Sequence, residues 1–224
     1  MDWRYNTIWT EQLPEAEFAT VNFNNRSEPP QTLTGKRYIA AAKFKSKSES
    51  LLDFPEVSGV DYLYIGSSNI KSFSGLSRIR DVRRLEAHYC LKLENDFGLS
   101  NLRNSLEWLH INQSKKFIPG KELFSLKKLR VLCLNVCGPL QDLEFLYNFP
   151  NLLDFRFVDT NVLSGDLTPL LRHPTLCSAG FLNKRHYNLK DTEVDEHLRP
   201  RWPAAIEKAH KGKYETYRYT SLDT

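Results

Sequence analysis

Residues 126–143 read LKKLRVLCLNVCGPLQDL. Leucines at positions 129, 132 and 134 are followed by Cys137 and then by Leu140. Apolar residues at offsets 0, 3 and 5, with a small residue at offset 8, match neither a helical period nor the alternation of a half-buried strand. The stretch therefore predicts a unit that joins a short strand to a turn, and the rest of the chain decides whether that unit repeats.

The same pattern recurs from residue 36 to residue 183. Its first apolar positions lie 21 to 24 residues apart, at Ile39, Val60, Val82, Leu106, Leu129, Leu152 and Leu176. Apolar residues also stand at offsets 3 and 5, and the five central copies carry Ser, Cys or Thr at offset 8. The first and last copies carry lysine there, as irregular terminal repeats do. Between the copies, phrases such as FSGLSRI and LFSLKKL predict short helical turns.

This pattern resembles the leucine-rich repeat family, in its short subclass of roughly 22 to 24 residues, which includes the internalins and the phosphatase-regulator type. The resemblance covers residues 36–183, about seven repeats. It implies an α/β solenoid, a right-handed coil with a parallel β-sheet on the concave side and short helical turns on the convex side. Such motifs specify a fold more closely than a function.

The segments outside the repeats are expected to cap the coil. Residues 1–35 carry more large aromatic residues than a disordered tail, which favours an N-terminal cap with short strands over the open edge of the sheet. Residues 184–224 are polar and basic and are interpreted as a C-terminal cap and tail. A helix is expected there from Pro203 to about His210, with Trp202 and Ile206 packing on the last repeat.

Composition narrows the function classes. The chain has 224 residues, of which 41% are hydrophobic and 26% charged, which is ordinary for a globular protein. A net charge of +4 is too balanced to indicate nucleic-acid binding. No apolar run approaches the ~20 residues of a membrane span, and no secretion signal is expected at the N-terminus. The four cysteines are too sparse for a disulfide scaffold, so we expect reduced thiols, a cytoplasmic location and no membrane partner.

The outward face of the expected sheet is the candidate binding surface. Offsets 2, 4 and 6 alternate with the core positions, so residues far apart in sequence form rows across neighbouring strands. Exposed Tyr, Trp and Arg in one patch have the composition of protein-binding hot spots. The plainer alternative is that these large side chains only fill the inner curve. The candidate partner-binding residues are Tyr62, Tyr64, Arg84, Glu86, His88, Trp108, His110, Asn112, Asp154 and Arg156.

The sequence therefore predicts a non-enzymatic module that binds a protein partner through the concave face, as an adaptor or as a regulatory or inhibitory subunit. A bacterial immunity protein that neutralises a toxin is a sharper form of this hypothesis. No cofactor and no metal are expected.

Two alternatives stay open. Glu86, His110 and Cys133 fall on consecutive strands in the order orienter, base and nucleophile, which is typical of a thiol-dependent enzyme. An open sheet lacks an oxyanion donor and a cleft, and the same residues with His88 lack a paired metal-ligand motif. The basic run GKRYIAAAKFKSKS, residues 35–48, is the basis for a nucleic-acid-associated scaffold, although no aromatic stacking platform accompanies it.

Overall fold

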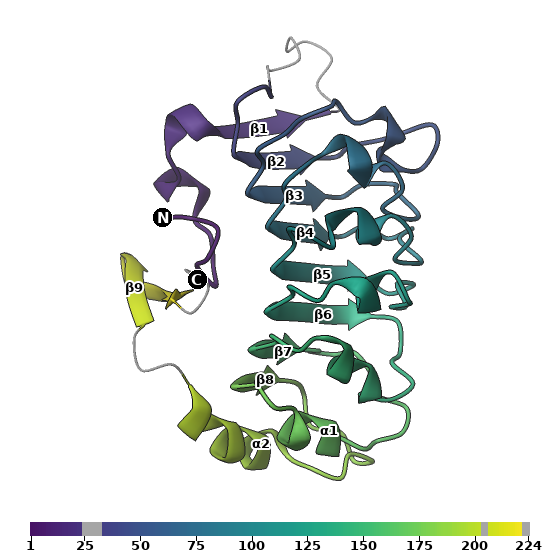
Figure 1. Cartoon of the computed structure of the whole chain (residues 1–224), viewed down its shortest axis with the longest axis vertical. Coiled ribbons are helices and arrows are strands. Elements are labelled where there is room, and N and C mark those ends of the chain that lie inside the picture. Colours follow the sequence, from purple (N-terminus) through teal and green to yellow (C-terminus); the bar gives the residue numbers. More distant parts are fainter. Residues whose placement is uncertain (24–32, 203–205, 221–224) are drawn as a thin grey trace.

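The computed structural model describes residues 1–23, 33–202 and 206–220. Eight parallel strands form one sheet in strict chain order, with each strand paired to the next (Figure 1). The expected parallel sheet is confirmed, and the helix content is low. In the described part of the chain, no helix is long and apolar enough to cross a membrane.

The strands of the large sheet are short. They are β1 (Phe18–Asn22), β2 (Tyr38–Ala42), β3 (Tyr62–Gly66), β4 (Arg84–His88), β5 (Trp108–Ser114), β6 (Val131–Cys137), β7 (Asp154–Arg156) and β8 (Ser178–Gly180). Two further strands, β9 (Ile206–Lys211) and β10 (Tyr214–Tyr219), form an antiparallel hairpin.

Helical structure is confined to short segments. The 3₁₀ turns are η1 (Thr10–Gln12), η2 (Glu15–Glu17), η3 (Leu51–Asp53), η4 (Leu76–Arg78), η5 (Leu99–Leu102), η6 (Leu123–Ser125), η7 (Glu144–Asn148) and η8 (Arg199–Arg201). The α-helices are α1 (Thr168–Arg172) and α2 (Asp191–Leu198). Those from η3 to α1 lie between successive strands, where the sequence predicts helical turns.

The repeated apolar positions form the core. In the five central copies every residue at offset 0, 3 or 5 is fully buried and belongs to one cluster. The offset-3 residues, for example, are Leu63, Leu85, Leu109, Leu132 and Phe155. Because strand register aligns these positions side by side, each strand contributes the same three side chains to a continuous apolar spine.

The small residues at offset 8 join each unit to the one before it. Cys90 Sγ donates to Ile65 O at 3.8 Å, and Cys137 Sγ donates to Ile111 O at 3.5 Å. Thr160 Oγ1 donates to Leu134 O at 2.7 Å. These bonds satisfy carbonyl groups at the point where the chain leaves the strand, which explains why a small hydrogen-bonding side chain recurs there.

A ladder of alternating charge runs along the strand starts. The residue just before each of β2 to β6 is, in order, Arg37, Asp61, Arg83, Glu107 and Arg130. Arg37 pairs with Asp61. Glu107 pairs with both Arg83, at 2.5 Å, and Arg130, at 3.5 Å. Each strand therefore meets opposite charge on its neighbours.

The first repeat differs from its expected register. Ile39 pairs with Leu63 and Ala41 pairs with Ile65, so the copy is shifted by three residues. Its outward residues are Tyr38, Ala40 and Ala42. Counting offsets 2, 4 and 6 from Ile39 had predicted Ala41, Lys43 and Lys45 for the outward rows, which is wrong. The sequence offers two overlapping apolar frames here. The backbone at Lys43 is left-handed, with φ of 56°, and ends the strand. The frame that is adopted places Ile39 and Ala41 in the core.

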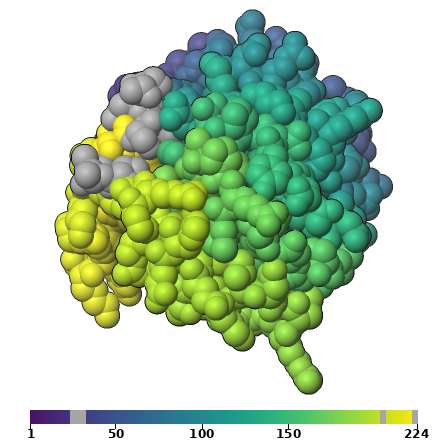
Figure 2. Space-filling view, turned by 60° about the horizontal axis from the view of Figure 1, so that its bottom comes forward, coloured from purple at the N-terminus to yellow at the C-terminus, as the bar shows by residue number. Residues whose placement is uncertain are grey.

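Both ends of the sheet are extended or covered by flanking segments. At one end β1 adds a strand to β2, with Phe18 opposite Tyr38. At the other end α2 buries Val194 and Leu198 beside β8. Figure 2 shows this C-terminal segment, in yellow-green, packed directly against the green surface of the last strands.

The helix expected from Pro203 to His210 is wrong for its described part. Residues 206–210 belong to β9, which turns back into β10 through Gly212, whose φ is 58°. A glycine with positive φ between two short antiparallel runs is typical of a hairpin. Residues 203–205 lie outside the described residues.

Replacing Leu132 by Ala is expected to lower the free energy of unfolding by about 3 kcal/mol, since Leu132 is fully buried in the spine. Urea denaturation followed by circular dichroism measures this change. The matched control is Leu91→Ala, because Leu91 is 65% exposed and should shift the unfolding free energy by less than about 0.5 kcal/mol. Equal effects of the two variants would contradict the assignment of the core.

Candidate functional site

The outward rows across the central strands agree with the sequence prediction. Strand register places Tyr62, Arg84, Trp108, Val131 and Asp154 in the first row. The second row holds Tyr64, Glu86, His110, Cys133 and Arg156. The third holds Gly66, His88, Asn112 and Asn135. Residues up to about 90 positions apart thus share one face.

The first row is not exposed. Tyr62, Arg84, Trp108 and Asp154 are all buried, with exposed fractions of 4% or less. They lie beneath residues 1–17 and the β9–β10 hairpin, residues 206–219, which together we call the terminal cover. Both segments lie on the same side of the sheet (Figure 1). The prediction that these four residues present an exposed hot spot is therefore wrong, because the protein's own termini occupy the row.

Arg84 fastens the N-terminal part of the cover to the sheet. Its guanidinium donates to the carbonyl oxygens of Trp3, at 2.9 Å, and of Tyr5 and Asn6. It also donates to Glu86 Oε1, through Nε at 2.7 Å and through Nη2. The face of the same guanidinium lies 3.9 Å from the centre of the Trp108 ring. All five N–H groups of the side chain are thus engaged.

Asp154 fastens the C-terminal part. Its Oδ2 accepts a hydrogen bond from the Tyr219 hydroxyl and another from Arg156 Nε at 3.0 Å. The Tyr219 ring packs edge-on against Trp108 with 5.2 Å between centroids. Trp202 packs against Tyr217 and Tyr219 from outside. The hairpin therefore closes over the row with an aromatic cluster around one buried carboxylate.

The two parts of the cover also bind each other. Asn6 N donates to Tyr217 O at 2.8 Å, and Tyr219 N donates to Arg4 O at 3.2 Å. The Tyr5 hydroxyl donates to Glu207 Oε1 at 2.7 Å. The N-terminal segment thus runs beside β10, and the two termini act as one covering unit.

The second and third rows stay partly open. Tyr64, His88, His110, Asn112 and Asn135 are half-buried, and we call these five residues the open strip. Tyr64 stacks on His88 with 5.2 Å between ring centroids, and His88 meets His110 edge-on at 4.7 Å. Tyr64, His88, His110 and Asn112 are thus the predicted site residues that remain together on an accessible surface. Arg156 is half-buried as well and lies further along the sheet, beside Asp154.

The asparagines orient the imidazoles. Asn112 Nδ2 lies 3.3 Å from His88 Nδ1, and Asn135 Nδ2 lies 3.2 Å from His110 Nε2. Asn135 Oδ1 accepts the Val158 amide proton at 2.9 Å, which fixes the orientation of its side-chain amide. Asn135 therefore donates to His110. The sequence analysis did not select Asn135, although it lies in the third row beside Asn112.

Glu86 is a buried charge with two cationic or donor neighbours. Oε1 faces Arg84, and Oε2 lies 2.9 Å from His88 Nε2. Burial acts to raise the pKa of Glu86, but the Arg84 charge and the His88 hydrogen bond outweigh it and hold that pKa well below its usual range. The carboxylate is therefore ionised in the folded protein.

The surroundings of Cys133 do not favour the thiol-dependent enzyme alternative. Cys133 is buried, and burial together with the Asp154 charge raises the pKa of its thiol far above the usual value. Burial also lowers the pKa of His110 to about 4, despite the nearby Glu86 charge. No hydrogen bond joins Cys133 to His110 within the described residues. A thiol that stays protonated beside an imidazole engaged by Asn135 lacks the activation that a nucleophile needs.

The basic run is partly used within the fold. Arg37 pairs with Asp61, Lys36 Nζ donates to Ala16 O, and Lys45 Nζ donates to Ser67 O. These contacts hold neighbouring strand ends, which fits the interpretation of the run as a solvated edge better than that of a nucleic-acid scaffold.

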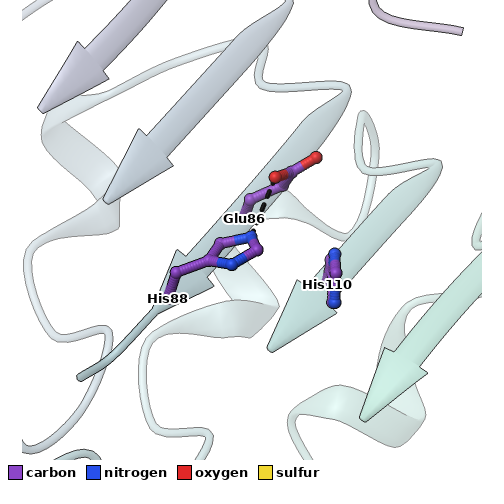
Figure 3. A group of neighbouring side chains, drawn as sticks. All are labelled: Glu86, His88 and His110. Carbon is purple, nitrogen blue, oxygen red and sulfur yellow. Dashed lines mark hydrogen bonds and ion pairs between the residues drawn. The ribbon is translucent and has the colours of Figure 1, made fainter. Parts of the chain in front are cut away.

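The structure brings together one group of metal-ligand types within the described residues. Glu86, His88 and His110 each offer one donor atom, and these atoms lie within 4.8 Å of one another (Figure 3). Glu86 and His88 come from β4 and His110 from β5. A spacing of two residues along one strand plus one residue on its neighbour is not a sequence motif, and the group emerged from the sequence only through the predicted rows.

Replacing Glu86 by Gln is expected to lower the free energy of unfolding by about 3 kcal/mol at pH 7, because it leaves Arg84 buried without its counter-charge. The folded pKa of Glu86 is lowered, so its contribution is fully present above the unfolded value of about 4.3 and is lost as pH falls towards the folded value. The gap between wild type and variant should therefore shrink at pH 3. Urea denaturation at both pH values measures it, with exposed Glu144→Gln as the control. A gap that is equal at both pH values would contradict this reading.

Cys133 is expected to resist iodoacetamide in the folded protein at neutral pH and to react once the chain is unfolded in urea, since burial keeps its thiol protonated. Peptide mass spectrometry after a short pulse measures the labelled fraction at each of the four cysteines. Cys177, which is also buried, is the internal comparison. Rapid labelling of Cys133 alone would revive the thiol-enzyme alternative.

Neither a scan against models of known protein families nor a search of curated proteins found a match to this chain.

Proposed function

We propose that this chain is a non-enzymatic protein-binding module of the leucine-rich repeat type, which recognises a protein partner through the open strip. The observation that carries the proposal is that Tyr64, His88, His110 and their asparagine partners form a half-buried, preorganised surface beside the covered first row.

Repeated backbone features support the solenoid part of the proposal. A non-glycine residue in the left-handed region lies at or near the end of each of the strands β3 to β7, at Ser67, Tyr89, Gln113, Val136 and Asp159. These positions recur with the spacing of the apolar pattern. The backbone amides of Ser67 and Tyr89 each donate to the carbonyl of the next strand's row, His88 O at 2.9 Å and Asn112 O at 3.0 Å. A chain that makes the same turn at the same place in each unit coils regularly.

The chemistry of the open strip supports the binding part. Stacked Tyr64 and His88 present rigid ring surface, and the amide groups of Asn112 and Asn135 hold the imidazoles in place. Ordered aromatic and amide side chains lose little conformational freedom when a partner binds, which favours affinity. The first row contributes by holding the strip's strands and the terminal cover rather than by contacting a partner.

The biological role is a further part of the proposal. An adaptor, a regulatory subunit and an inhibitor such as an immunity protein that neutralises a toxin all need a preorganised surface of this kind. The four cysteines are free thiols, which fits the cytoplasmic location expected from the sequence.

Alanine at Tyr64 and Asn112 together is expected to weaken capture of the partner at least tenfold, because both side chains are half-buried and each substitution removes contact area from the strip. Quantitative affinity capture from the native host, with wild type and variant at equal amounts, measures the loss. The control is the double variant Phe97→Ala and Leu163→Ala, whose residues are 60% and 51% exposed on the connections between strands.

The proposal predicts that at least one protein is retained by wild type and by the control and is lost by the strip variant. If the strip variant retains every protein that wild type captures, the open strip is not the binding surface. A thermal unfolding curve for each variant separates lost binding from lost folding.

A further inference from the structure

Glu86, His88 and His110 combine one carboxylate with two imidazoles. This donor set suits borderline divalent cations, and a His₂Glu set with an open fourth position occurs in zinc sites. The three residues come from two hydrogen-bonded neighbouring strands, so the rigid sheet fixes their spacing (Figure 3).

The separations are close to those of a coordination sphere. Zinc–nitrogen distances of roughly 2.0–2.1 Å place donor atoms about 3.4 Å apart in a tetrahedral site. Glu86 Oε2 and His88 Nε2 are already 2.9 Å apart, and no pair of donor atoms in the group exceeds 4.8 Å. A coordination sphere would bring the wider pairs of donor atoms closer together than they are here.

Each donor residue also has a supporting partner on its other polar atom. Arg84 holds Glu86 Oε1, Asn112 contacts His88 Nδ1, and Asn135 contacts His110 Nε2. The atoms left to face a cation are Glu86 Oε2, His88 Nε2 and His110 Nδ1. Supporting contacts of this kind orient the ligands in metal sites and tune their affinity.

We propose that Glu86, His88 and His110 form a binding site for one divalent transition-metal ion of the Zn²⁺ type, with the fourth coordination position open to water or to a partner's side chain. The inference does not depend on the proposed partner-binding function.

Binding requires a change of tautomer in both imidazoles. Without a cation, Asn135 donates to His110 Nε2, so the proton of the neutral ring is on Nδ1. In the bound state Nδ1 coordinates the ion and the proton is on Nε2. His88 likewise gives its Nε2 lone pair to the ion and carries a proton on Nδ1, so Asn112, whose Nδ2 now faces that atom, must turn its side-chain amide to present Oδ1 as the acceptor.

Besides the turn of the Asn112 amide and the loss of the His88–Glu86 hydrogen bond, two further contacts oppose binding. The Arg84 charge already neutralises part of the Glu86 charge. Asn135 presents a donor where the bound His110 needs an acceptor. Aspartate at position 135 can accept from both the Val158 amide and His110 Nε2–H, which removes the second obstacle. The structure thus assigns to residue 135 control over cation affinity without direct coordination.

Isothermal titration of tag-free protein with zinc chloride tests the site, and cobalt(II) provides a spectroscopic readout of coordination geometry. Wild type is expected to bind one Zn²⁺ per chain, and Co²⁺ is expected to give the visible bands of a four-coordinate site. His88→Ala and His110→Ala should each weaken binding at least tenfold. Asn135→Asp should tighten it about tenfold.

The matched control is His210→Ala, because His210 is an exposed histidine beside Glu215 and represents adventitious surface binding. Its Kd should equal that of wild type. The proposal is overturned if wild type shows no saturable binding. It is also overturned if His88→Ala and His110→Ala keep the wild-type Kd, or if His210→Ala loses as much affinity as they do. Circular dichroism of each variant confirms that the compared proteins are folded.

Discussion

In-register parallel pairing of successive strands is the constraint on which this structure depends. Because each strand places the same three apolar positions against the same positions of its neighbour, one buried spine runs from Val60 to Phe157. The register also fixes what stands on the other face, since side chains alternate along a strand. A shift of one residue in any strand would bury its outward residues and expose its leucines. The strand register therefore determines both which residues form the core and which lie on the surface.

Side chains on the outward face are also held by specific contacts, and these contacts are polar. Arg84 uses all its donors to bind three backbone carbonyls of the N-terminal segment and the carboxylate of Glu86. Asp154 attaches the hairpin by accepting a hydrogen bond from the Tyr219 hydroxyl. Two buried charges, one basic and one acidic, thus attach the N-terminal segment to β4 and the C-terminal hairpin to β7. Neither end is an appendage.

The periodic part of the chain could be predicted from sequence because local pattern and tertiary packing agree there. Leu132 is apolar for the strand and for the core alike. The pattern identified the face of Trp108 correctly but carried no information about what covers it, since the contact with Tyr219 joins residues more than a hundred positions apart. The hairpin was taken for a helix because β9 is short and its alternation is weak. The predicted register of the first repeat was wrong for a different reason, because Ala41 and Ala42 fit the apolar pattern equally well.

Part of the candidate site could be predicted from the sequence. The row assignment already placed Glu86 beside His110, which the register confirms. The roles of Arg84, Asn112 and Asn135 as supports depend on side-chain directions that a row diagram does not contain. Those directions show that Cys133 is buried in a hydrophobic cluster and that the imidazoles lie close to Glu86.

The alternating charges before β2 to β6 impose a parity rule on how this protein can lengthen or shorten. Deleting one strand unit from the interior of the ladder would set like charges side by side, for example Arg37 next to Arg83. Deleting two adjacent units would restore the alternation and set Arg37 next to Glu107. Duplications follow the same arithmetic. Within the ladder, units are thus expected to be gained or lost in pairs. The unit that repeats without changing the charge pattern consists of two strands.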